Sequence, residues 1–288
     1  MKRALVIGGS GQLGTAIAAR WHDFEIVAPA HHELGIEQTL RLEERLDRVT
    51  PDVLLNAAAF HDVDRCEAEP QRAFEINARA AGAAARLAAA RDTVFVTVST
   101  DYVFDGKKGE PYTESDAPNP LSAYGSSRLA GERLVEAAGG RAFVVRTCGL
   151  YGTSRSASRR PTFIERILRQ GSQGEPVRVV ADVIASPTYS NDLADALHAL
   201  VGTQAYGLYH AAGAGAVSWF DFAQEALAQA GVGLPIEPIS AGQWKAAAIR
   251  PRFSALDNAK LRGLGIALRP WRAGLAEYLG ALAEIGVR

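Results

Sequence analysis

A threonine, a tyrosine and an arginine occur in this chain in an order that suits reduction of a carbonyl group. Thr100 ends a short apolar run, and Tyr124 and Arg128 stand one helical turn apart where a helix is expected to open. The Thr100 hydroxyl can fix a carbonyl oxygen while the Tyr124 phenol donates a proton as hydride arrives. A cation at Arg128 is expected to lower the phenol pKa from about 10 by roughly one to three units.

Three glycines follow the first apolar run, Ala4 to Ile7, at the spacing of a dinucleotide-binding turn: Gly8, Gly11 and Gly14. Without Cβ atoms the backbone can turn tightly, approach a pyrophosphate and let the next helix pack closely on the strand. The pattern alone also fits an ordinary glycine-rich turn. Its position at the first strand-to-helix turn, with further such units behind it, favours a nicotinamide dinucleotide site.

The choice of nicotinamide cofactor depends on the end of the second strand. An acidic residue there would normally bind the adenosine ribose, but the chain reads Ala28-Pro29-Ala30-His31-His32. No carboxylate would repel a 2′-phosphate, and two imidazoles stand nearby, although both can equally be solvated loop residues. The sequence therefore favours NADPH slightly and leaves NADH open.

Short β-branched runs alternate with helical patterns through the first half, which predicts βαβ units around a parallel sheet. Strands are expected at 4–7, 25–28, 53–56, 93–99 and 142–147, and helices at 13–21, 40–49, 73–90 and 126–138. The predicted fold class is α/β, with a doubly wound Rossmann-type parallel sheet and a small C-terminal α/β substrate-binding region.

The texture of the sequence changes after Tyr151. Residues 1–150 are predicted to form the dinucleotide-binding domain, with a return segment near 185–212, and residues 151–288 a discontinuous substrate-binding region. Further helices are expected at 163–170, 191–200, 218–230 and 271–285, and strands at 177–180 and 207–211. The loop 153–160 carries three arginines, which could close over an anionic substrate or stay mobile and solvated.

Bulk properties narrow the class of partner. The formal net charge of -1 lacks the positive field expected of a nucleic-acid binder. No run is long enough to cross a bilayer, the start is too short for a signal peptide, and no metal-ligand cluster occurs. The two cysteines, Cys66 and Cys148, are far apart, so a reducing cytoplasm is the simplest location. We expect a small-molecule substrate and regard a homodimer as compatible with the sequence.

Several longer runs carry a resemblance to a known family. The chain resembles the extended short-chain dehydrogenase/reductases, and within them the dTDP-4-dehydrorhamnose reductases. The runs STDYVFDG from Ser99 and RPRFSALD from Arg250 are the most specific. Others are Gly8 to Gly14, NAAAFHDVDRCEAEP from Asn56, PLSAYGSSRLAGE from Pro120, RTCGLYG from Arg146, SPTY from Ser186 and GLYHAAG from Gly207.

The resemblance implies NAD(P)H-dependent reduction of the 4-keto group of a dTDP-linked 4-keto-6-deoxysugar, which yields dTDP-L-rhamnose for cell-surface polysaccharide. It implies catalytic places for Thr100, Tyr124 and Arg128, of which the last two also contact the cofactor. The other implied contacts are Gly11, Gln12 and Leu13 for the pyrophosphate, Ala58, Ala59 and Phe60 for the nucleotide, Val63, Thr100 and Asp101 for the sugar, and Arg250 for the diphosphate.

The chain departs from the family pattern at three places. Arg128 replaces the lysine of Tyr-x-x-x-Lys, and a planar guanidinium keeps the charge but binds ribose hydroxyls differently and cannot relay a proton. Gly149 stands where some members carry a tryptophan against the sugar, and the acidic residue after the second strand is missing. The first departure concerns catalysis, whereas the other two concern binding.

Two other functions fit parts of the same pattern. A sugar-nucleotide epimerase or dehydratase would use the same cofactor, but dehydratases usually carry an Asp-Glu pair after the threonine, and here Asp101-Tyr102 follows Thr100. A non-catalytic module similar to the regulatory β subunit of methionine adenosyltransferase would share the DYVFDG and RPRFSALD runs. Arg128 keeps this second alternative open, whereas the presence of Thr100 and Tyr124 favours a catalytic function.

Overall fold

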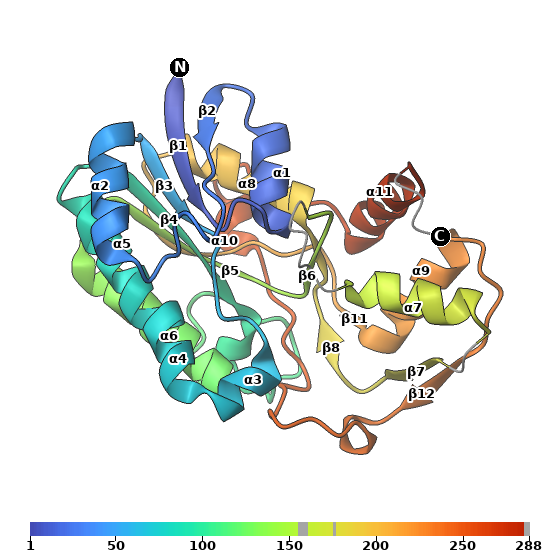
Figure 1. Ribbon diagram of the computed structural model, residues 1–288. Coiled ribbons are helices and arrows are strands. Elements are labelled where there is room, and N and C mark those ends of the chain that lie inside the picture. Colours follow the sequence, from blue (N-terminus) through green and yellow to red (C-terminus); the bar gives the residue numbers. More distant parts are fainter. Residues whose placement is uncertain (155–160, 175–176, 285–288) are drawn as a thin grey trace.

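The first half of the chain forms the parallel sheet that its apolar runs predict. In the computed structural model, which describes residues 1–154, 161–174 and 177–284, six parallel strands pair in the order β2-β1-β3-β4-β5-β10 (Figure 1). Their bounds are Lys2–Ile7 (β1), Phe24–Val27 (β2), Val53–Asn56 (β3), Val94–Thr100 (β4), Ala142–Thr147 (β5) and Gly207–His210 (β10). The prediction of a Rossmann-type parallel sheet is confirmed.

Helices cover both faces of this sheet (Figure 1). The helices α1 and α8 pack on one face, and α2, α5 and α6 on the other. Their bounds are Gln12–Arg20 (α1), Ser190–Val201 (α8), Thr39–Val49 (α2), Ala81–Ala89 (α5) and Ala123–Ala138 (α6). Because both faces are covered, the carboxyl ends of the strands remain as the edge where a ligand can bind.

The helix expected over residues 73–90 is observed as a continuous helical stretch over residues 70–89, but a π-helical segment interrupts its regular hydrogen bonding. The stretch consists of α4 (Pro70–Phe74), the π-helical turn (Glu75–Ala80) and α5, and the short helix α3 (Val63–Ala68) precedes it. The wide turn carries Asn77, whose side chain bonds the backbone of Phe60 and the Ser127 hydroxyl. Turns of this kind inside helices often serve functional sites, and this one fixes the segment after β3.

The C-terminal part builds a second, smaller core beside the sheet. Its helices α7 (Phe163–Ser172), α9 (Trp219–Gln229) and α11 (Trp271–Glu284) pack together in one apolar cluster. Two-stranded pairs join β7 (Val177–Val180) with β12 (Ile236–Ile239), β8 (Ile184–Ala185) with β11 (Val217–Ser218), and β6 (Leu150–Tyr151) with β9 (Thr188–Tyr189). The short helix α10 (Ala259–Arg262) lies between β12 and α11 in the chain. The proposed division at residue 150 stays a prediction.

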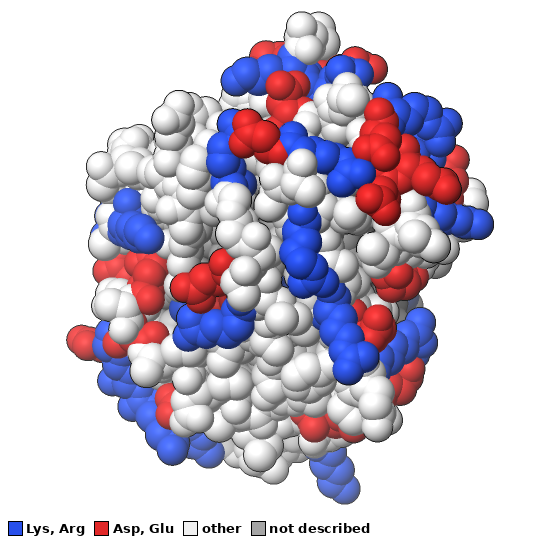
Figure 2. All heavy atoms as spheres, turned by 90° about the vertical axis from the view of Figure 1, so that its left-hand side faces the viewer, with Lys and Arg blue, Asp and Glu red and all other residues white. Residues whose placement is uncertain are grey.

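The surface of the sheet domain carries charges of both signs. Figure 2 shows basic and acidic side chains interspersed over this face. Among the described residues, no helix is both long and apolar enough to span a membrane. The arginine-bearing stretch 155–160, for which a lid or a mobile loop was expected, lies outside the described residues.

Candidate active site

The glycine turn after β1 is shaped by close backbone contacts. Gly8 has φ +83°, and a Cβ there would lie 2.9 Å from the Ala58 backbone nitrogen. A Cβ on Gly14 would come within 2.4 Å of the Gly9 Cα. Gly9, which the sequence reasoning missed, is equally constrained, because its Cβ would lie 2.5 Å from the Ala28 Cβ. The turn therefore passes tightly between the ends of β2 and β3.

The first turn of α1 leaves main-chain groups at this glycine turn. Gly11 is the residue before the helix, and a Cβ there would meet only the Gly8 carbonyl oxygen, at 3.3 Å. The Leu13 side chain is buried in the core, so only its backbone N–H is available to a ligand, whereas Gln12 is half-buried. The N–H groups of a helix start favour an anion, which fits the expected pyrophosphate position.

The segment after β3 forms a wall beside the turn. Ala58 and Ala59 are half-buried, and the Asn56 side chain holds the Ala58 N–H at 3.1 Å. The Phe60 ring packs into a small cluster and lies between the Arg65 and Arg72 guanidinium groups. The alanines thus present a smooth surface at the sheet edge, while Phe60 contributes mainly through its backbone position.

Thr100, Tyr124 and Arg128 come together at the carboxyl edge of the sheet. Thr100 ends β4, and its hydroxyl lies close enough to Tyr124 to act on the pKa of that phenol. The helix α6 begins earlier than predicted, at Ala123, because the Ser122 hydroxyl accepts the Gly125 N–H at 3.1 Å. Tyr124 therefore lies in the first helical turn and Arg128 one turn later. The edge of the Tyr102 ring meets Tyr124, with centroids 5.7 Å apart.

Gly125 permits this close approach of α6 to the end of β4. A Cβ at Gly125 would lie only 2.2 Å from the Tyr102 carbonyl oxygen. Any larger residue would push the helix start, and with it Tyr124, away from Thr100. The sequence reasoning missed this residue, and its signal was only a glycine directly after the tyrosine.

The electrostatic setting of Tyr124 corrects one expectation. Burial raises the pKa of Tyr124 above its ordinary value, although the Arg128 charge and the nearby Thr100 hydroxyl both act to lower it. The expected net lowering of the pKa is therefore wrong, because desolvation of the phenolate outweighs the nearby cation. The phenol keeps its proton at neutral pH.

Arg128 is a buried cation. Its residue is 6 % exposed, and its Nε atom has no hydrogen-bond partner among the described residues. The Thr147 hydroxyl is also buried and also lacks a partner within the described part of the chain, and it lies in register with Thr100 at the ends of β5 and β4. Buried polar groups are nearly always hydrogen-bonded in native proteins. Two such groups at one edge indicate a polar ligand there.

Asp101 is buried and bonded to internal partners. Its carboxylate accepts hydrogen bonds from the Thr100 hydroxyl and the Cys148 thiol, both at 3.1 Å, and from Ser254. Burial raises the pKa of the Asp101 carboxyl, because desolvation disfavours its charged form. The structure thus surrounds Asp101 with internal partners, and its expected contact with a sugar stays a prediction.

Val63 and Arg250 lie close to each other at the rim of the site. Val63 is half-buried at the start of α3, and the next residue, Asp64, accepts a hydrogen bond from Arg250 Nη2 at 2.9 Å. Arg250 Nη1 also donates to the Ala248 carbonyl oxygen at 3.2 Å. The ion pair holds Arg250 in place and offsets part of its charge, so its contact with a diphosphate stays a prediction.

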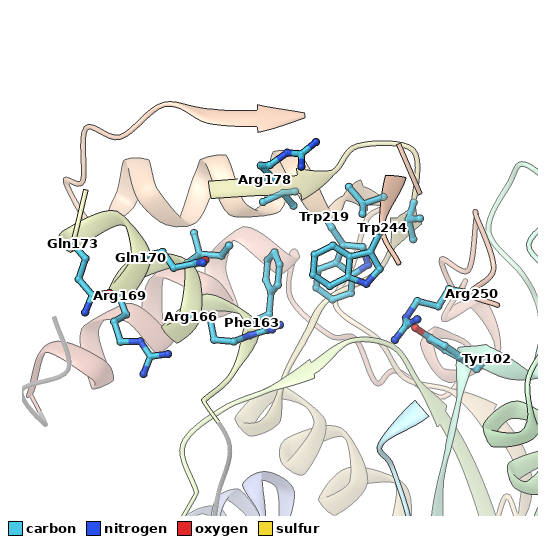
Figure 3. Close-up of a pocket in the computed structure, with 14 residues that line it drawn as sticks. Tyr102, Phe163, Arg166, Arg169, Gln170, Gln173, Arg178, Trp219, Trp244 and Arg250 are labelled. Carbon is cyan, nitrogen blue, oxygen red and sulfur yellow. The ribbon is translucent and has the colours of Figure 1, made fainter. Parts of the chain in front are cut away.

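A pocket of about 740 Å³ opens next to Tyr102 and Arg250, between the sheet domain and the C-terminal core (Figure 3). Phe163, Trp219 and Trp244 give it aromatic walls, and Arg166, Arg169, Arg178 and Arg250 give it positive charge. No carboxylate lines it among the described residues. The sequence reasoning missed this pocket, because its walls come from segments far apart in the chain.

The departure at Gly149 has a structural counterpart in this pocket. Gly149 has φ +51°, and a Cβ there would lie 3.0 Å from the Trp219 ring. The missing side chain leaves room for Trp219, which α9 brings in and which lines the pocket. An aromatic ring therefore lies beside position 149, but it comes from another element. Within the described residues, no group of three or more His, Cys, Asp or Glu could hold a metal ion.

Comparisons with known proteins agree with this architecture. The family model described as RmlD substrate binding domain matches residues 1–284. The spore coat polysaccharide biosynthesis protein SpsK of Bacillus subtilis is 33% identical over 97% of both chains. A dTDP-4-dehydrorhamnose reductase of Aggregatibacter actinomycetemcomitans is 35% identical over 99% of this chain and 100% of its own length. The crystal structure of dTDP-4-dehydrorhamnose reductase from Bacillus anthracis in complex with NADP has a TM-score of 0.92 and 33% identity, covering 98% of this chain and 100% of that one.

Proposed function

This chain belongs to the RmlD substrate binding domain family, and we propose that it reduces the 4-keto group of a dTDP-4-dehydro-6-deoxysugar with NADPH. The reaction in the proposal converts dTDP-4-dehydrorhamnose to dTDP-L-rhamnose, the substrate in the names of several relatives. The family predicted from the sequence is confirmed. The observation that carries the proposal is the meeting of Thr100, Tyr124 and Arg128 next to an arginine-lined pocket.

The residues present fit a nicotinamide dinucleotide. The glycine turn and the start of α1 would hold the pyrophosphate, the wall at Ala58 and Ala59 would cover the nucleotide, and Arg128 and Thr147 would use their unpaired donors on the polar groups near the ring. When bound, NADPH supplies the hydride. The chain's own groups bind and orient it.

NADPH is preferred over NADH on two grounds. The NADP-bound relative from Bacillus anthracis shares the fold over nearly the whole chain. In this chain the residues directly after β2 lack a carboxylate, and His31 and His32 are exposed. The next acid, Glu33, accepts the Ala30 N–H at 2.8 Å, which occupies it locally. A 2′-phosphate would therefore meet little repulsion at this edge.

Tyr124 is suited to donate the proton in the reductive direction. A phenol whose pKa is raised remains protonated at working pH, so it is an acid ready for use. The Arg128 charge and the nearby Thr100 hydroxyl both favour the phenolate and would stabilise it after the proton has left. Thr100 and Tyr124 together would fix the carbonyl oxygen. Arginine at position 128 therefore retains the electrostatic part of the lysine's role.

The pocket suits the nucleotide end of the substrate. Aromatic rings can stack on a base, and guanidinium groups bind phosphate oxygens. Arg166 projects from α7 toward the aromatic residues of the pocket (Figure 3), Arg169 lines the pocket from the same helix, and Arg250 lies at the end nearest Tyr102. Because the Tyr102 ring also contacts Tyr124, a ligand in the pocket can place its sugar at the phenol. Dehydratase chemistry has less support, because the carboxylate after Thr100 is bound internally.

We extend the proposal to the cellular compartment of the protein and to its oligomeric state. Cys66 and Cys148 are both buried free thiols, which supports a reducing compartment, the cytoplasm. A homodimer remains compatible with the chain.

The test is oxidation of NADPH and of NADH by the purified protein with dTDP-4-dehydrorhamnose, followed by loss of nicotinamide absorbance and by chromatography of the product. We expect stoichiometric dTDP-L-rhamnose and higher kcat/KM with NADPH. Cofactor binding without turnover on any dTDP-4-keto-6-deoxysugar would contradict the proposal and favour a regulatory module. Conversion of the keto sugar to an isomer without net cofactor consumption would instead indicate an epimerase.

A further inference from the structure

Arg128 lies one helical turn before a second buried charge, Glu132, but the two side chains do not pair. Arg128 is 6 % and Glu132 7 % exposed, and both lie on the inner face of α6. Opposite charges at this spacing on a helix ordinarily attract each other, and burial strengthens the attraction. In the part of the chain that the structure describes, Arg128 nevertheless has no ion-pair partner, and its Nε is unbonded.

Glu132 is held by a different arginine. Its Oε1 accepts a hydrogen bond from Arg146 Nε at 2.9 Å, and its Oε2 accepts one from Arg146 Nη2 at 2.7 Å. The Ser99 hydroxyl donates a further hydrogen bond to Oε1. This two-pronged contact is the geometry in which a guanidinium binds a carboxylate most strongly. Both oxygens of Glu132 are therefore directed at the sheet and away from Arg128.

The sheet holds Arg146 in this position. Ser99, Arg146 and His210 lie in register on β4, β5 and β10, so they form one row across three strands. The Arg146 guanidinium also lies over the Phe104 ring, at 5.1 Å. Burial and the Arg146 charge lower the pKa of His210 to about 3, so His210 is neutral and does not compete for Glu132.

We propose that Arg146, with Ser99, acts as a positioning residue that captures Glu132 and thereby keeps Arg128 free to bind the cofactor and to stabilise the Tyr124 phenolate. The inference rests on the proposed function, because it takes Arg128 as a cofactor contact. Without this contact, the Glu132 side chain would turn toward Arg128, which lies one helical turn away on α6, and would neutralise its charge. The buried row of Ser99, Arg146 and His210 thus keeps the charges of Arg128 and Glu132 apart on one face of α6.

A purely structural role for the pair makes a different prediction. If the contact only ties α6 to β5, removing Arg146 lowers the stability and removing both partners restores part of it, but the Kd of the folded protein for NADPH stays the same in all variants. If the contact captures Glu132, removing Arg146 harms cofactor binding only while the Glu132 carboxylate remains. The double substitution separates the two, because it removes both the captor and the competitor.

The experiment compares the wild type with Arg146→Met, Glu132→Gln and the double variant by NADPH titration, read as protein fluorescence, with folding checked by circular dichroism. We expect Arg146→Met to raise the Kd for NADPH about tenfold, the loss of a charge-assisted contact. Glu132→Gln alone should lower the melting temperature but leave the Kd close to that of the wild type. The double variant should return most of the lost affinity.

A double variant that binds NADPH as weakly as Arg146→Met overturns the inference, and so does an Arg146→Met protein that binds normally. If Arg146→Met does not fold, Arg146→Lys takes its place, since a single ammonium leaves one Glu132 oxygen unclaimed. Its smaller loss of affinity must then be reversed by adding Glu132→Gln, and failure to reverse it overturns the inference. A wild type that does not bind NADPH counts against the proposed function instead.

Discussion

The sheet edge around Tyr124 and the pocket beside α7 hold their charged groups in opposite ways. At the edge, Arg128, Glu132 and Arg146 are buried, and strand register or helix spacing fixes each of them. In the pocket, Arg166 and Arg169 are exposed, and Trp244 is 49 % exposed. The proposed catalytic edge is thus preorganised, whereas the pocket proposed for the nucleotide is open and adaptable. Substitutions in the two regions should therefore change different kinetic constants.

The largest effect should follow Tyr124→Phe, which removes the proton donor and keeps the ring. We expect kcat to fall by about a hundredfold or more, because general acid catalysis contributes that much, while the NADPH Kd stays nearly unchanged. Steady-state kinetics and NADPH titration measure the two quantities. Tyr206→Phe, at a half-buried ring away from the site, is the matched control. Turnover close to that of the wild type would refute the role of Tyr124.

The buried row at the sheet edge should also make stability depend on pH. The folded-state pKa of His210 is lowered to about 3. Between about pH 6.5 and pH 3 the imidazole is therefore protonated in the unfolded chain but neutral in the folded protein. Stability should therefore fall as pH falls through this window, by up to about 1.4 kcal/mol per pH unit.

Urea unfolding at pH 7 and pH 5 tests this expectation. His210→Gln should remove up to about 2 kcal/mol of the difference between the two pH values. The control His22→Gln, at an exposed imidazole, should keep the full pH dependence. If the unfolding free energies of His210→Gln and the wild type changed equally between pH 7 and pH 5, His210 would not be a neutral imidazole in the folded protein.

In the pocket, Trp244→Ala should act on binding alone. Loss of one stacking surface should raise the KM for the nucleotide sugar about tenfold and leave kcat near its original value. Leu40→Ala is the control, since Leu40 is 77 % exposed on α2, away from the pocket. A fall in kcat without a change in KM would break the division of labour between the two regions.

The smallest effect is expected for Arg166→Gln and Arg169→Gln. Both side chains are exposed, so each should raise the substrate KM only a few-fold at low ionic strength. The rise should shrink as salt is added, because exposed charges are screened. The control Arg133→Gln, on the solvent side of α6, should leave KM unchanged at every salt concentration. An effect independent of salt would mean that these arginines act through packing.

Much of the fold could be predicted because its signals are local. The run from Ala4 to Ile7 is apolar, the run from Val53 to Asn56 is apolar up to its last residue, and both form central strands of the sheet. The glycine turn and the order Thr100, Tyr124, Arg128 were also visible in the sequence, and the structure brings all three side chains to one edge. Local periodicity did not reveal the π-helical turn at Asn77, because that turn depends on contacts with Phe60 and Ser127.

The sequence by itself determined which residues can do chemistry and which strands must carry them, since residue type and apolar spacing are properties of short segments. Only the tertiary structure decided the protonation of Tyr124, the pairing of Glu132 with Arg146, and the pocket formed with Trp219 and Trp244. The reason is physical: burial, strand register and the approach of distant segments set the energy of a charge or a ring, and none of these is written in a neighbouring residue.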